Sequence, residues 1–164
     1  MNSEHETPVE PSSTPKTKIS IRRIDGAKEK ELLIALQKRI LPGDEPDPVE
    51  HGFWWIAKTD TGLPVGFCAL KPSSKWSDTM YLSRSGVLWA FRGQGFQKRF
   101  IRVRERFAKE LGMNWLISDT YFNPPSSNSL IKCGFKLFQP TEPWGFKTAL
   151  YWRKRISKPT SKES

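Results

Sequence analysis

The segment from Val87 to Leu111 constrains the fold more than any other part of the chain. An apolar stretch ends near Leu88, a turn with two glycines follows, and apolar residues then recur every three or four positions. That period is typical of a helix with one buried face. We therefore predict a strand, a glycine turn and a helix over residues 94–111 that packs on a sheet. The predicted apolar stripe comprises Phe96, Phe100, Val103, Phe107 and Leu111.

Other elements follow from apolar alternation and from turn residues. Asp25-Gly26 and Leu41-Pro42-Gly43 bracket a helix, and Asp60-Thr61-Gly62 joins two strands as a hairpin. The predicted strands are 19–24, 53–57, 65–70, 80–88, 115–118, 135–138 and 146–151, with a short helix at 127–132. This order suits an α/β fold whose sheet is antiparallel early and has one parallel crossover. We expect a ligand at that crossover.

Length and composition indicate one domain with a tail at each end. A chain of 164 residues can bury a sufficient core without a disulfide or metal. Residues 1–17 carry few apolar side chains and are predicted to be a flexible tail, as is the basic segment 157–164. The domain is predicted to span residues 18–156. No window approaches the roughly 20 apolar residues of a membrane span, so we expect a cytoplasmic protein with no membrane partner.

The cysteines and histidines form no pattern typical of a metal site or a catalytic triad. Cys68 and Cys133 lie far apart and match no metal-ligand spacing, so we interpret both as buried thiols. His5 and His51 are isolated in the sequence. No metal cofactor is therefore expected.

The chain is basic, with a net charge of +10 and a pI near 9.8. Such a balance attracts polyanions but does not distinguish nucleic acid from an anionic cofactor. Part of the charge lies in the segment from Arg153 to Lys162. A denser cluster comprises Arg92, Lys98, Arg99, Arg102, Arg104, Arg106 and Lys109, beside the glycine turn.

The turn Arg92-Gly93-Gln94-Gly95 has the composition of an anion cradle. Two glycines let the backbone approach an anion without a side-chain clash, and the first amides of the following helix offer free donors. A pyrophosphate fits this description, although a tight corner is the alternative. The Walker pattern is absent, and the dinucleotide-binding pattern is incomplete because its third glycine is replaced by Lys98.

Two motifs resemble the GNAT N-acetyltransferase superfamily. Residues 87–95 look like its acetyl-coenzyme A signature, in which Arg92 and Gly95 match and Gln97 replaces the usual small residue. Asn123-Pro-Pro-Ser126, followed by Leu130, Lys132 and Gly134-Phe135, resembles its Asn-x-x-Ala/Ser stretch. The resemblance covers roughly residues 19–152. It implies a mixed, mostly antiparallel sheet whose fourth and fifth strands splay apart, with flanking helices.

The resemblance implies acetyl-CoA as co-substrate and assigns residues to it. Backbone amides of Gln94, Gly95, Phe96 and Gln97 would hold the pyrophosphate, and Arg92, Lys98 and Arg99 would neutralise its charge. Backbone groups of Val87 and Trp89 would pair with the pantetheine arm as an added strand. Asn123 and Ser126 would lie near the same arm, and Trp89 or Phe91 is a candidate for facing the cleft.

For catalysis the resemblance implies direct attack of a primary amine on the thioester in a ternary complex. The Leu88 amide is the expected oxyanion donor. The tyrosine that commonly serves as acid falls at Leu130, so Tyr121 and Ser129 are alternatives, with Asn123 nearby. The thiolate leaving unassisted or with a proton from water is a further alternative. Asp119, Asp78 or a water chain are candidates for the base.

The acceptor is an amine of unspecified class, and one alternative is an amine attached to an anionic or nucleic-acid-linked molecule. A monomer and a homodimer are both compatible with the sequence. The main rival to an enzyme is a non-catalytic module of the same fold, or a nucleic-acid-binding module that uses the basic helix and tail.

Overall fold

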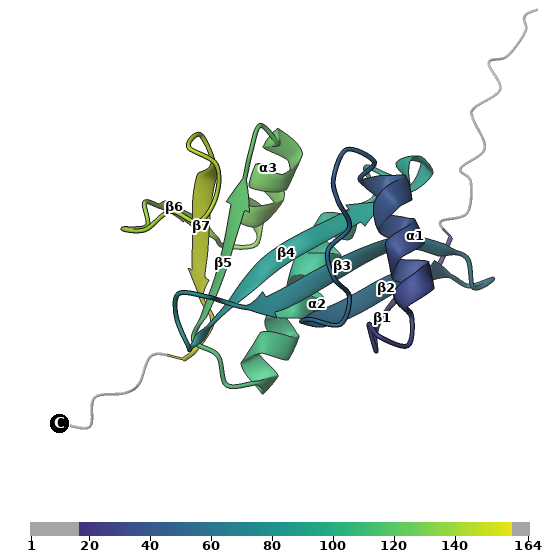
Figure 1. Ribbon diagram of the computed structural model, residues 1–164, viewed down its shortest axis with the longest axis horizontal. Coiled ribbons are helices and arrows are strands. Elements are labelled where there is room, and N and C mark those ends of the chain that lie inside the picture. The colour runs from purple at the N-terminus through teal and green to yellow at the C-terminus, as the bar shows by residue number, and fades with distance from the viewer. Residues whose placement is uncertain (1–16, 159–164) are drawn as a thin grey trace, which may run out of the picture.

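The computed structural model describes residues 17–158 and contains one seven-stranded mixed sheet with three α-helices (Figure 1). The strands follow the spatial order β1-β2-β3-β4-β5-β7-β6. In chain order the elements are β1 (Ile19–Ile24), α1 (Lys30–Ile40), β2 (Phe53–Thr59), β3 (Pro64–Pro72), β4 (Thr79–Val87), the short 3₁₀ helix η1 (Trp89–Phe91), α2 (Phe96–Glu110), β5 (Trp115–Thr120), α3 (Pro124–Lys132), β6 (Lys136–Phe138) and β7 (Leu150–Arg155).

The topology confirms the predicted fold class. Strands β1 to β4 pair antiparallel in sequence order, β4 and β5 pair parallel, and β5, β7 and β6 pair antiparallel. Helix α2 forms the crossover between the two parallel strands. In Figure 1, β4 and β5 diverge along their length, and α1 and α2 lie on opposite sides of the sheet. The parallel crossover therefore opens at the carboxyl ends of β4 and β5.

Two apolar cores, one on each face of the sheet, hold the helices. Helix α1 buries Leu33, Leu36 and Ile40 against Trp54 and Phe67. Helix α2 packs on the opposite face in a larger cluster, which includes Phe96, Phe100, Ile101, Ala108, Met80, Leu82 and Leu116. Because both faces of β3 and β4 are covered, these two strands are the rigid centre from which the β4–β5 gap opens.

The buried face of α2 differs from the predicted stripe. Leu111 is exposed, whereas Arg104 is 2% exposed and lies among the core residues. Arg104 is therefore a core residue, although it belongs to the dense group of basic residues in the sequence. The helix ends as expected for a glycine after its last turn, since Gly112 has a φ of +76° and its amide donates to the Lys109 carbonyl.

The last strand is also displaced from the prediction. Residues 146–151 were expected to form it, but β7 runs over Leu150–Arg155, and residues 139–149 form a long connection from β6. Trp144 in this connection packs edge-on against Tyr151 at 4.7 Å between ring centroids. An apolar side chain thus anchors the loop, and the strand is set by its pairing with β5.

The expected tails lie almost wholly outside the described residues, since only Thr17 of 1–17 and residues 157–158 of 157–164 are included. Within the described range, no helix is long and apolar enough to cross a membrane.

Candidate functional site

Strands β4 and β5 pair over only three residues each, and the gap between them begins after the third. Thr79, Met80 and Tyr81 face Trp115, Leu116 and Ile117, and beyond them the two strands separate. On its other edge β4 carries a bulge, because both Ser83 and Arg84 lie opposite Ala69 of β3. A bulge bends a strand and increases its twist. The predicted splay is therefore present, and the bulge supplies a physical reason for it.

Backbone groups of β4 beyond the bulge face the gap in alternation. The Leu88 amide donates to the Val65 carbonyl of β3 at 2.8 Å. It is therefore not a free oxyanion donor, and that prediction was wrong. Because hydrogen-bonding directions alternate along a strand, the Val87 amide points the other way, into the gap. The register of β4 against β3 therefore leaves the Val87 amide, and not the Leu88 amide, available to a ligand in the gap.

The glycine turn is open to solvent at the mouth of this gap. Gly93 and Gly95 have φ values of +77° and +78°, and a side-chain carbon at either would meet nothing within 4 Å. Gly95 is the N-cap of α2 and offers no side-chain cap, and the first intrahelical bond runs from Arg99 to its carbonyl. The amides of Phe96, Gln97 and Lys98 are therefore free to bind an anion. This geometry fits a pyrophosphate.

A groove leads from the turn into the gap. A cavity of about 510 Å³ is lined by residues of the turn, of β4 and of α3, among them Val87, Phe91, Gly95, Asn123 and Ser126. A second cavity of about 290 Å³ continues between β4 and β5. Both are lined by Ser85 and Gln97, whose side chains share a hydrogen bond of 2.8 Å. Gln97, which stands where the family signature has a small residue, thus lies where the two cavities meet.

The charged and aromatic residues near the turn divide into two groups. Arg92 and Lys98 line the groove, with the Arg92 guanidinium 4.5 Å from the Trp89 ring centroid. Arg99 instead donates to the Ile19 carbonyl at 2.8 Å and does not line the groove. Trp89 lies in η1 rather than in a strand, and its carbonyl accepts from the Arg92 amide at 3.1 Å, so that carbonyl is not available for the expected strand pairing with a pantetheine arm. Phe91, not Trp89, faces the cleft.

The second motif forms the start of α3. Asn123 is the N-cap, and its Oδ1 accepts from the Ser126 amide at 3.2 Å, with prolines at the first helical positions. Proline suits these positions because it lacks an amide hydrogen that would go unpaired. The cap directs the helix so that Asn123, Ser126 and Ser129 line both cavities.

Replacing Asn123 by alanine should lower the free energy of unfolding by about 0.5–2 kcal/mol, because the Ser126 amide loses its acceptor. Thermal or urea unfolding measures the change. Asn128→Ala, at an exposed position of the same helix, is the control and should change stability by less than about 0.5 kcal/mol. Equal losses in the two variants would contradict the capping role.

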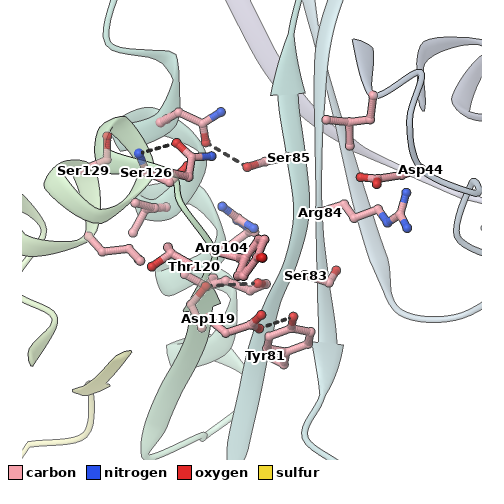
Figure 2. Close-up of a pocket in the computed structure, with 18 residues that line it drawn as sticks. Asp44, Tyr81, Ser83, Arg84, Ser85, Arg104, Asp119, Thr120, Ser126 and Ser129 are labelled. Carbon is pink, nitrogen blue, oxygen red and sulfur yellow. Dashed lines mark hydrogen bonds between the residues drawn. The ribbon is translucent and has the colours of Figure 1, made fainter. Parts of the chain in front are cut away.

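Asp119, at the end of β5, is held across the gap by two donors. Its Oδ1 accepts from the Tyr81 hydroxyl at 2.5 Å (Figure 2). The same oxygen accepts from the Trp144 indole at 3.2 Å. The second oxygen, Oδ2, has no hydrogen-bond partner within residues 17–158. Burial and the neighbouring carboxylate raise the pKa of Tyr81, so the phenol stays protonated. The sequence did not predict that Tyr81 and Trp144 contact Asp119, because they lie 38 and 25 positions from it.

The other catalytic candidates are placed differently. Tyr121 lines the smaller cavity, is half exposed and packs against Phe122 and Phe146. The Ser129 hydroxyl donates to the Pro125 carbonyl within α3. Asp78 binds Thr79 and Asn114 at the opposite end of β4 and does not line the gap. The structure therefore brings Asp119, Tyr121 and Ser129 to one cavity and leaves Asp78 outside it.

The described residues contain no cluster of three or more His, Cys, Asp or Glu side chains that could hold a metal ion. Cys68 is fully buried, which raises the pKa of its thiol to about 12, and burial also raises the pKa of Cys133.

Residues 25–135 match the model of the acetyltransferase (GNAT) family, and the chain belongs to that family. It is a family of acyltransferases, which agrees with the splayed strands and the glycine turn. The search of curated proteins finds no match.

Solved structures share the fold at low sequence identity. An IAA acetyltransferase from Bacillus cereus is 21% identical, with a TM-score of 0.63 over 84% of this chain and 99% of its own. An N-acetyltransferase from Staphylococcus aureus Mu50 is 17% identical, with a TM-score of 0.65 over 86% and 100%. The yncA protein of Salmonella typhimurium, solved with its cofactor acetyl-CoA, is 13% identical, with a TM-score of 0.67 over 88% and 98%.

Proposed function

We propose that this chain is an N-acetyltransferase that moves an acetyl group from acetyl-CoA to a primary amine. The observation that carries the proposal is the continuous groove from the free amides at Gly95 to the gap between β4 and β5. A phosphate-binding turn at one end and unpaired strand edges at the other match the two ends of a coenzyme A thioester. The Salmonella protein of the same fold is known with acetyl-CoA, which supports this assignment.

The nucleotide end is proposed to bind at the start of α2. Amides of Gly95, Phe96, Gln97 and Lys98 would donate to the pyrophosphate, and the helix dipole would favour its negative charge. Arg92 and Lys98 line this part of the groove and add positive charge. The Val87 backbone would pair with the pantetheine arm, because its polar groups face the gap.

In the reaction the amine nitrogen attacks the thioester carbonyl, the carbon–sulfur bond breaks, the amine loses one proton and the departing thiolate gains one. Asp119 is the proposed base, because its Oδ2 is free and Tyr81 and Trp144 hold its Oδ1. The Val87 amide is the proposed donor to the developing oxyanion. Tyr121 and Ser129 remain the candidates for protonating sulfur.

Thermal melting with acetyl-CoA tests the binding half of the proposal. Ligand at a hundred times its dissociation constant should add about 2.7 kcal/mol to the free energy of unfolding. Pantetheine, the part of coenzyme A that lacks the pyrophosphate and the nucleotide, should give a much smaller shift. Absence of any shift with acetyl-CoA would count against the proposal. Thiol release from acetyl-CoA in the presence of a panel of amines then measures the transfer itself and narrows the acceptor.

A further inference from the structure

A charged side chain is buried at the base of the β4–β5 gap. Arg104 of α2 is 2% exposed, and it lines the cavity of about 290 Å³ together with Asp119 and Leu130. In Figure 2 it lies between β4 and β5. This volume is close to the lower end of the range for small-ligand pockets, about 300–1,000 Å³. The cavity therefore has a cationic wall at the point where the proposed reaction takes place.

Only part of the Arg104 guanidinium is satisfied by the fold. Nε donates to the Phe100 carbonyl and Nη1 donates to the Ala69 carbonyl, each at 3.0 Å. Ala69 lies opposite the β4 bulge, so Arg104 supplies a donor where the strand pairing is interrupted. Nη2 has no hydrogen-bond partner within residues 17–158, and no carboxylate in that range lies within 4.0 Å of the guanidinium.

The ionisable neighbours of Arg104 do not balance its charge. The thiols of Cys68 and Cys133 and the phenol of Tyr81 lie near it, and burial raises the pKa of all three, so they are neutral near pH 7. The carboxylates that line the same cavity are Asp44 and Asp119, and neither forms an ion pair with it. A guanidinium is always charged and is costly to bury without a partner.

Two further polar groups of the cavity are unsatisfied. The Ser83 hydroxyl and Nη1 of Arg84, both at the bulge, are buried and have no hydrogen-bond partner in the part of the chain that the structure describes. Arg84 uses its Nε for Asp47, at 3.3 Å. Donors that lack acceptors are the groups that a bound anion satisfies. Figure 2 shows Arg84 beside Asp44 and apart from Arg104, so Arg104 is the guanidinium available at the β4–β5 gap.

We infer that the cavity between β4 and β5 binds a carboxylate carried by one of the two substrates, with Arg104 as its principal partner. The turnover test of this inference rests on the proposed acyl transfer. The binding test does not, because it needs no reaction. Two sources share this chemistry. The acceptor is an amino acid, whose amine would meet Asp119 while its carboxylate meets Arg104, or the acyl group of the donor ends in a second carboxylate.

Two turnover comparisons distinguish the sources. With acetyl-CoA as donor, a panel of amino acids is compared with the matching amino acid amides. With the amides as acceptors, succinyl-CoA is compared with acetyl-CoA. The wild-type protein should favour the carboxylate-bearing member of one pair by about tenfold or more in kcat/KM, as expected for a hydrogen bond to a charged group. Arg104→Met should abolish that preference, and Arg104→Lys should retain part of it.

A binding measurement decides the inference if no turnover is found. Succinate and glycine, the latter compared with glycinamide, are titrated against the protein at an ionic strength held constant with chloride. At least one carboxylate should raise the melting temperature of the wild type but not that of Arg104→Met. Arg102→Met is the control, because Arg102 is exposed on the same helix, and this variant should keep the rise. Two results would overturn the inference. The first is no kcat/KM preference in either substrate pair together with no rise in melting temperature beyond that seen with chloride. The second is an equal loss of kcat/KM for both members of each pair in Arg104→Met. Failure of the proposed function itself would instead show as no acetyl-CoA binding and no thiol release.

Discussion

Replacing Gly95 by valine should abolish the stabilisation of the protein by acetyl-CoA while leaving the fold intact. Gly95 has a φ of +78°, and the space beside it is empty of protein atoms. A branched side chain would occupy the space where the pyrophosphate is proposed to lie and would pull the turn from its left-handed conformation. The loss of two or more charge-assisted hydrogen bonds should weaken affinity by about 100-fold or more. The shift in melting temperature with ligand measures it.

The matched control for this variant is Gly112→Val at the other end of α2. Gly112 has a φ of +76° and also has nothing within 4 Å, so both substitutions place valine in the same strained backbone region. Each should cost about 1–2 kcal/mol of stability. Only the change at Gly95 should remove the ligand shift. If both variants keep the shift, the phosphate cradle lies elsewhere.

Replacing Asp119 by asparagine should lower turnover by about 10²–10⁴-fold, the usual contribution of a positioned general base. The amide oxygen of asparagine can still accept from Tyr81 and Trp144, so the geometry is preserved while the basic group is lost. The melting shift with acetyl-CoA should remain. Steady-state thiol release over a range of amine concentrations measures the change in kcat.

Tyr81→Phe is the control for Asp119→Asn. It removes one donor to Oδ1 but leaves the carboxylate and the Trp144 hydrogen bond in place. Its effect on kcat should therefore be about tenfold or less, consistent with the loss of one hydrogen bond. Full turnover in Asp119→Asn would assign the base to a water chain or to another group.

The features predicted well from the sequence are those that depend on neighbours in the chain. The helix after the glycine turn, its end at Gly112 and the order of the elements along the chain follow from local apolar periods and from glycine conformations. Helix α3 begins at Pro124, earlier than the predicted start at residue 127, because the Asn123 cap places both prolines in the first helical turn, where proline is tolerated. Local signals therefore gave the class of fold and the position of the groove.

The errors within the site concern contacts between distant segments. The available amide is at Val87 rather than Leu88 because pairing with β3 sets the direction of each hydrogen bond. Arg104 is buried because the β4 bulge exposes the Ala69 carbonyl, 35 positions away, to its guanidinium. No property of the residues around Arg104 distinguishes it from the exposed Arg102 or Arg106.

The sequence by itself determined that a glycine turn joins a strand to an amphipathic helix, because backbone conformation and side-chain period are properties of adjacent residues. Only the tertiary structure decided that Asp119 is held by Tyr81 and Trp144, and that the Arg104 guanidinium faces the gap without an ion-pair partner among residues 17–158. Those contacts depend on register, on the bulge and on the divergence of β4 from β5. Each of these arises only when distant strands pair.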